Sequence, residues 1–189
     1  MSTPVPDSPQ TCTAFIGPLR LASGALAEVA VAVHRALEAD PQTSILVFDD
    51  QTARLVDLDT RGDEAAVRAR YAPESEPPRG RGRPKLGVVA REVTLLPRHW
   101  DWLSRQPGGA SVALRKLVDG ARSDGRSQVR EAQEAAYRFM SAMGGDLPGF
   151  EEASRALFAG DRGGLEDRMA PWPADLREHV LRLAQGAWS

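Results

Sequence analysis

The sequence has a single cysteine, Cys12, and no long apolar segment. One thiol excludes an internal disulfide and is typical of proteins from a reducing cytoplasm. No apolar run approaches the roughly 18 residues that a membrane-spanning helix needs, so we expect no membrane partner. The first residues, rich in Pro, Ser and Thr, lack the basic start and apolar stretch of a signal peptide. We therefore expect a cytoplasmic protein with a disordered tail over residues 1–12.

The usual marks of catalysis and metal binding are missing as well. The three histidines, His34, His99 and His179, have no ligand spacing, so no zinc site is expected. There is no phosphate-binding loop with a Gly-Lys-Ser/Thr ending and no Gly-x-Ser-x-Gly elbow. Aspartates gather around one predicted hairpin at 49–59, where we expect a solvated acidic turn, with a divalent-cation site as the alternative. The sequence predicts a protein that is not an enzyme and needs no cofactor.

Charge, by contrast, is distributed very unevenly. The chain has 24 Lys/Arg and 26 Asp/Glu, a net charge of −2. Residues 78–130 hold 12 Lys/Arg against 4 Asp/Glu, a net charge of +8, whereas residues 1–77 (6 against 12) and 131–189 (6 against 10) are acidic. A basic centre between acidic ends is typical of a protein that binds a polyanion. The alternative is that the three parts attract one another within the fold.

The basic centre opens with Arg79-Gly-Arg-Gly-Arg-Pro-Lys85, which contains the Arg-Gly-Arg-Pro-Lys core of an AT-hook. Such an element lies in the minor groove of A·T-rich DNA, which is narrow and strongly negative. Glycine leaves room beside the groove walls, and Pro84 keeps the backbone extended so that arginines can follow the groove floor. We predict DNA contacts from Arg79, Arg81, Arg83 and Lys85. An inert basic linker and a segment that docks onto an acidic surface are the alternatives.

Residues 13–72 are predicted to form a small ββαββ domain, with a β-grasp-like arrangement as one candidate. Two β-prone runs at 13–17 and 19–22 meet at a Gly-Pro turn, and apolar residues at helical spacing predict a helix over about 25–39. A compact apolar run predicts a strand at 44–48. Alternation of Leu/Val with Asp predicts another at 54–59, after a turn at 49–52. A short helix at about 63–71 ends this α+β domain.

Residues 73–87 are predicted to be a basic linker, because their prolines and glycines cannot sustain a helix or a central strand. Residues 88–122 then resemble a ribbon–helix–helix segment. A strand over 88–96 is followed by a helix that Pro97 opens, a Pro-Gly-Gly break at 107–109, and a second helix from Ser111 to about Ala121. In that fold two chains pair their strands into a ribbon that enters the major groove. The pattern therefore predicts a homodimer.

Further DNA contacts are predicted in the same segment. Ser111 lies where the start of the second helix would meet a phosphate, and Arg98, Arg115 and Lys116 are candidates for other phosphates. The strand suits base reading poorly, because Glu92 would face outward. An ordinary helical hairpin with a leading strand is the alternative. Two tryptophans, Trp100 and Trp102, are expected in a core or an interface, Trp100 especially in a core, rather than stacked on bases.

Residues 123–189 are predicted to be a helical part with a structural or dimer-forming role. Apolar residues at helical spacing and glycine stops give helices at about 128–143, 150–159, 165–170 and 174–187. None of these helices carries a basic stripe.

Several segments resemble known proteins, and the resemblance covers nearly all of the chain after the tail. They are Leu21-Ala-Ser-Gly24, Phe48-Asp-Asp50, Val56-Asp-Leu-Asp59, Gly82-Arg-Pro-Lys-Leu-Gly-Val-Val-Ala-Arg-Glu-Val-Thr-Leu-Leu-Pro-Arg-His-Trp100 and Leu147-Pro-Gly-Phe150. The chain is thereby similar to bacterial domain-of-unknown-function family 2239. The resemblance implies a bacterial protein in which linker, strand and helices belong to one unit. It implies no activity.

Two functions from different classes fit these patterns. The first is a non-enzymatic, dimeric DNA-binding protein, a transcriptional regulator or a nucleoid-associated protein, which prefers A·T-rich double-stranded DNA. The second is a protein–protein adaptor whose basic linker docks onto an acidic surface.

Overall fold

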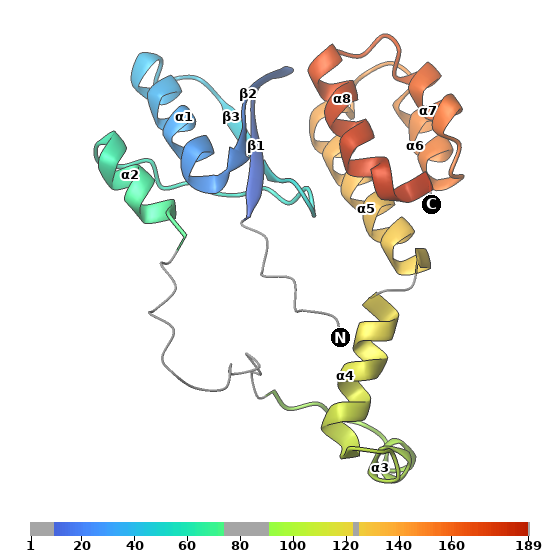
Figure 1. Ribbon diagram of the computed structural model, residues 1–189. Helices are drawn as coiled ribbons and strands as arrows, with labels where there is room; N and C mark the ends of the chain where they lie inside the picture. The colour runs from blue at the N-terminus through green and yellow to red at the C-terminus, as the bar shows by residue number, and fades with distance from the viewer. Residues whose placement is uncertain (1–9, 74–90, 123–124, 189) are drawn as a thin grey trace. The chain divides into compact units, whose positions relative to one another are not determined.

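The computed structural model describes residues 10–73, 91–122 and 125–188, and these form two units (Figure 1). Unit 1 joins residues 10–73 to residues 128–188, and unit 2 holds residues 91–122 and 125–127. Residues 1–9 of the predicted tail lie outside the described residues, as does most of the predicted linker. Thr11 and Cys12, predicted in the tail, belong instead to the first strand, where the Cys12 side chain is buried. Unit 1 is thus built from two segments that are far apart in the chain.

A three-stranded antiparallel sheet, with strand order β2-β1-β3, forms the first half of unit 1. β1 (Thr11–Ile16) and β2 (Leu19–Ala25) meet at a tight turn, where Gly17 has a φ of +51° that favours glycine. β3 (Ile45–Asp49) pairs with the other edge of β1. The two predicted strands at the start of the domain and the strand at 44–48 are confirmed.

β1 is buried along most of its length because helices cover both faces of the sheet. Cys12 and Ala14 pack toward α1 (Leu26–Ala39), and Phe15 packs on the opposite face with Phe48 and Phe139. Alternate residues of a strand point to opposite faces, so a strand covered on both sides reads as a continuous apolar run. The sheet therefore lies between α1 and the C-terminal helices.

The predicted strand at 54–59 does not form, which corrects the ββαββ order to ββαβ. Only Leu55 makes an isolated bridge, to Phe48, and the Val56 amide donates to the Val47 carbonyl at 2.8 Å. Val56 and Leu58 do pack against the cluster under α1, so the alternation reports real one-sided burial. The alternation predicted that burial correctly, but not a ladder of backbone hydrogen bonds.

Helix α2 (Glu64–Tyr71) packs on α1 and completes the N-terminal half of unit 1. Asp63 caps its start by accepting from the Ala66 amide at 2.8 Å, and Val67 is fully buried against α1. Arg35 and Glu64 form an ion pair between the two helices at 2.7 Å.

The second half of unit 1 is helical, as predicted. It contains α5 (Gly125–Gly144, whose first three residues lie in unit 2), α6 (Phe150–Phe158), α7 (Arg162–Arg168), α8 (Ala174–Leu183) and a 3₁₀ turn η1 (Ala184–Trp188) (Figure 1). Their buried side chains share one core with Phe15 and Phe48 of the sheet. In the described part of the chain, no helix has the length and apolar character to cross a membrane.

Unit 2 is a helical hairpin made of α3 (Pro97–Ser104) and α4 (Gly109–Arg122). Pro97 stands at the first helical turn, as predicted, and the positive φ angles of Gly108 and Gly109 turn the chain between the helices. The predicted strand at 88–96 is not present over its described part, residues 91–96. Strand formation requires a neighbouring backbone to bond with, and residues 91–96 pair with no strand in the described chain.

Candidate interaction surface

The helical hairpin of unit 2 exposes far more apolar surface than it buries. Only Leu103 and Ala113 are buried within it. Six large apolar side chains are between 41% and 56% exposed: Val93, Leu96, Trp100, Trp102, Leu117 and Val118. We call these six residues the hairpin apolar set. They are six of the ten large apolar side chains that the described residues expose, although residues 91–122 are a small part of the chain.

Trp100 lies outside any core, which corrects the prediction made for it. It is 41% exposed, and Trp102 is 50% exposed. Helical spacing alone placed these side chains in a core or an interface, and the spacing cannot distinguish the two. Of these two alternatives, an interface is the one that remains, because within the described chain too few apolar side chains cover either ring.

The apolar stripe predicted for the second helix is likewise uncovered. Leu117 and Val118 are exposed and Leu114 is half-buried. Arg115 and Lys116 are exposed beside this stripe on the same helix, and Arg98 is exposed on α3. The hairpin residues 91–122 hold 6 Lys/Arg and 3 Asp/Glu, a net charge of +3. An apolar stripe flanked by cations is therefore the main surface feature of unit 2.

Ser111 is placed differently from the prediction. Helix α4 begins at Gly109, so Ser111 lies inside the first turn and is exposed instead of preceding the helix as its cap. Of the other predicted DNA contacts, Arg79, Arg81, Arg83 and Lys85 lie outside the described residues. The structure thus brings Arg98, Ser111, Arg115 and Lys116 onto one hairpin, all exposed.

A polar network in unit 1, buried at Thr13 and His179 and exposed at Arg182, was not foreseen from the sequence. One Nη of Arg182 on α8 shares its two N–H groups among three acceptors, Asp50 at 2.9 Å, Thr13 at 2.7 Å and Nδ1 of His179 at 2.7 Å. Thr13 also donates to Asp50 at 2.7 Å and lies 3.0 Å from the Ser23 hydroxyl. These contacts connect α8 with all three strands or their ends. Since the partners come from positions up to 169 residues apart, no local sequence pattern could have found them.

His179 is neutral in this network. A guanidinium can only donate, so Nδ1 of His179 accepts from Arg182 and the ring proton belongs on Nε2. Burial, together with the positive charges of Arg182 and Arg20, lowers the pKa of His179 to about 3. Nε2 is buried and has no partner among the residues that the structure describes, and the ring packs between Phe15 and Phe139 at centroid distances of 5.2 and 4.3 Å. The network fastens the helices to the sheet and contains no activated nucleophile.

The aspartates at 49–59 do not converge on one point in the described structure. Asp49 accepts from the Gln51 and Thr52 amides, Asp50 belongs to the network around Arg182, and Asp59 is paired with Arg61 at 2.8 Å. Their oxygens are turned to separate partners, and no group of three acidic, His or Cys side chains converges anywhere in the described residues. Burial, followed by Asp49 and Asp50, raises the pKa of Cys12 to about 11, which keeps that thiol unreactive.

One known protein family matches most of the chain. Residues 11–184 match the model of DUF2239, described as an uncharacterized protein conserved in bacteria. The chain belongs to this family. No curated protein and no solved structure matches the chain.

Membership of DUF2239 extends across both units. The match runs from the first strand to the end of α8, so the hairpin of unit 2 lies within the family domain and is no appended segment. The segments that suggested the family lie in different places, including Leu21–Gly24 in β2, Phe48–Asp50 at the end of β3, and Leu147–Phe150 at the start of α6. The family description names no activity.

Proposed function

We propose that the chain is a non-enzymatic binding protein that acts as a homodimer, with the hairpin apolar set at the dimer interface. The observation that carries this proposal is the exposure of six large apolar side chains on a hairpin that buries only Leu103 and Ala113. A pair of helices with so small a core gains little stability by itself. Covering the set removes apolar surface from water at about 25 cal/mol per Å².

A second copy of the chain fits this surface better than a transient partner does. Permanent homodimer interfaces resemble a protein core cut in half, whereas transient interfaces are about as polar as the rest of the surface. The hairpin apolar set contains two tryptophans and four aliphatic side chains. Its flanking cations, Arg115 and Lys116, lie beside the stripe and can remain in water when the stripe is buried.

Sedimentation equilibrium of the full chain tests the dimer. We expect a dimer at micromolar concentration, and we expect Leu117→Asp to raise its dissociation constant by at least about 100-fold, because the interface would bury an unpaired carboxylate. Leu19→Asp is the matched control, since Leu19 is 65% exposed on β2, outside the hairpin. It should leave the dimer intact. A wild-type chain that stays monomeric at high micromolar concentration, or equal weakening by the two variants, would contradict the proposal.

DNA binding by the pair is a second candidate, favoured by the exposed Arg98, Arg115 and Lys116 on the hairpin. Two copies that each use these three residues and Lys85 of the AT-hook core would make roughly 8 phosphate contacts, which gives a slope of log affinity against log salt of about −7. Removing Arg115 and Lys116 from both chains should reduce the slope by about 3 to 4. Fluorescence anisotropy with A·T-rich and G·C-rich duplexes measures the slope and the preference.

The control for this measurement removes the same charge elsewhere. Arg155→Ala with Arg162→Ala deletes two exposed cations of unit 1, whose side chains are 74% and 64% exposed, and should leave the slope unchanged. Arg83→Ala, in the AT-hook core, should abolish the preference for A·T-rich duplex while weaker binding persists. If the wild type binds neither duplex at about 50 mM salt, DNA binding is wrong and the adaptor function takes its place.

A further inference from the structure

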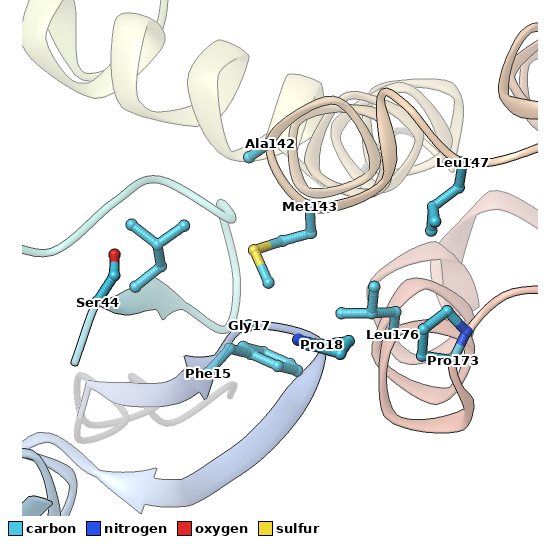
Figure 2. A pocket seen from close by; sticks show the side chains of 10 residues that line it. Phe15, Gly17, Pro18, Ser44, Ala142, Met143, Leu147, Pro173 and Leu176 are labelled. Atoms are coloured by element: carbon cyan, nitrogen blue, oxygen red, sulfur yellow. The ribbon is translucent and has the colours of Figure 1, made fainter.

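Unit 1 contains an apolar cavity between its sheet and its helices, outside the surface that we propose for the dimer. The cavity has a volume of about 460 Å³. Its lining comes from the β1–β2 turn, the start of β3, the end of α5 with the loop after it, and the start of α8 (Figure 2). Phe15 forms part of its floor, and Met143 points from α5 toward it. All of these segments belong to the compact unit 1.

We infer that this cavity is a binding site for a small, uncharged, largely apolar molecule, of the class of an aromatic compound or a medium-chain alcohol. Small-molecule sites have volumes of about 300–1,000 Å³ and mostly apolar linings with few polar groups. None of the ten residues that line this cavity carries a charge. An ionised ligand would lose its hydration there without a counter-charge, which costs several kcal/mol.

One polar side chain, at the rim of the cavity, can orient a bound ligand. Ser44 lies at the rim, exposed, and its hydroxyl has no partner among the described residues. Leu46, Met143 and Leu176 line the apolar interior. A ligand with one hydroxyl or carbonyl group can therefore bond to Ser44 while its apolar body fills the space beneath. A partner protein is a poorer fit, because a stable protein interface buries about 800 Å² on each side.

The walls are fixed by contacts that do not involve a ligand. The Arg20 amide donates to Asp175 at 2.8 Å and the Arg20 guanidinium pairs with Glu178 at 3.2 Å, which holds the β1–β2 turn against α8. On the opposite side, Trp172 donates to the Pro148 carbonyl at 2.8 Å and so fixes the loop after α5. The floor is rigid because Phe15 packs against Phe48 and Phe139. A preformed cavity binds its ligand at a smaller entropic cost.

The neutral fluorescent probe N-phenyl-1-naphthylamine tests this site in the full chain. Ala142 is exposed at the rim, and Ala142→Phe should place a ring in the cavity and weaken probe binding at least tenfold. Ser141→Phe is the matched control: it adds a ring at the neighbouring exposed position of α5, which does not line the cavity, and binding should stay within twofold of wild type. Equal binding by both variants would overturn the site.

Competition and NMR make the test independent of any single variant. Octanol should displace the probe at a concentration at least tenfold lower than octanoate, and equal competition would overturn the assignment to uncharged ligands. In the wild type, methyl resonances of Met143 and Leu176 should shift on probe addition, whereas those of Leu117 in the hairpin should not. Shifts confined to Leu117 would mean that the probe binds the hairpin apolar set, and the cavity assignment would be wrong.

Discussion

At the scale of single residues, His179 has an unusual position. Its ring lies between two phenylalanines, accepts a hydrogen bond from Arg182, and keeps Nε2 away from water. Adding a proton would place a positive charge beside Arg182 in a buried site, which explains why the pKa falls to about 3. Between these two pKa values, His179 therefore stays neutral in the folded chain, whereas in the unfolded chain it binds a proton below the ordinary histidine pKa of about 6.5.

This difference predicts that stability falls as the pH drops. Between pH 6.5 and pH 3 the unfolded state binds one more proton at this position, so the free energy of unfolding decreases by up to about 1.4 kcal/mol per pH unit. Between pH 7 and pH 5 we expect a loss of about 2 kcal/mol. Urea denaturation of the full chain at several pH values and constant ionic strength measures it.

The matched variants separate His179 from the other titrating groups. His179→Gln should be less stable than wild type at pH 7 but should lose less stability toward pH 5. His99→Gln, at an exposed position of α3, should keep the wild-type profile. The idea fails if His179→Gln follows the same slope as the wild type.

At the scale of elements, the end of α5 is defined by its close approach to a tryptophan. A Cβ on Gly144 would lie 2.9 Å from the Trp172 ring, too close for the ring to remain in place, and 3.4 Å from Leu147, at the limit of ordinary contact. Trp172 cannot withdraw freely, because it is buried and donates to the Pro148 carbonyl. Glycine is therefore required here for space rather than for backbone conformation.

Two glycine-to-alanine substitutions compare this crowded position with an open one. Gly144→Ala should lower the free energy of unfolding by about 1–3 kcal/mol, the usual cost of overpacking. Gly120→Ala, on α4, meets nothing within 4 Å and should stabilise its helix by about 0.5–1 kcal/mol. Urea denaturation measures the first, and amide hydrogen exchange in α4 the second. A stabilising Gly144→Ala would show that Trp172 can move aside.

At the scale of the whole molecule, local sequence patterns predicted most helices and strands but not the contacts between them. Helix limits followed from spacing and stops: Asp63 caps α2, and Pro97 opens α3. The strand at 54–59 was wrong because alternation reports burial of one side, which an extended segment without a ladder also has. The strand at 88–96 was predicted from a pattern that requires a second chain.

The candidate sites were less predictable than the fold. The cations of the hairpin, Arg98, Arg115 and Lys116, were identified from charge alone. The network around Arg182 and the cavity beside Phe15 could not be, since each unites residues from the two ends of the chain. Only three-dimensional packing brings such residues together, and contacts between residues so far apart in the chain cannot be predicted from a single sequence.

The discontinuous core of unit 1 has a consequence for how the protein is made. A ribosome releases β1 and β3 first, yet Phe15 and Phe48 find their partner Phe139 only after the whole hairpin segment has been synthesised. Domains generally fold as units, and contacts between distant residues form late. During translation the nascent sheet therefore has one apolar face uncovered until the C-terminal helices have been synthesised. In the dimer that we propose, the two hairpins are available to pair before the core of either unit 1 is complete.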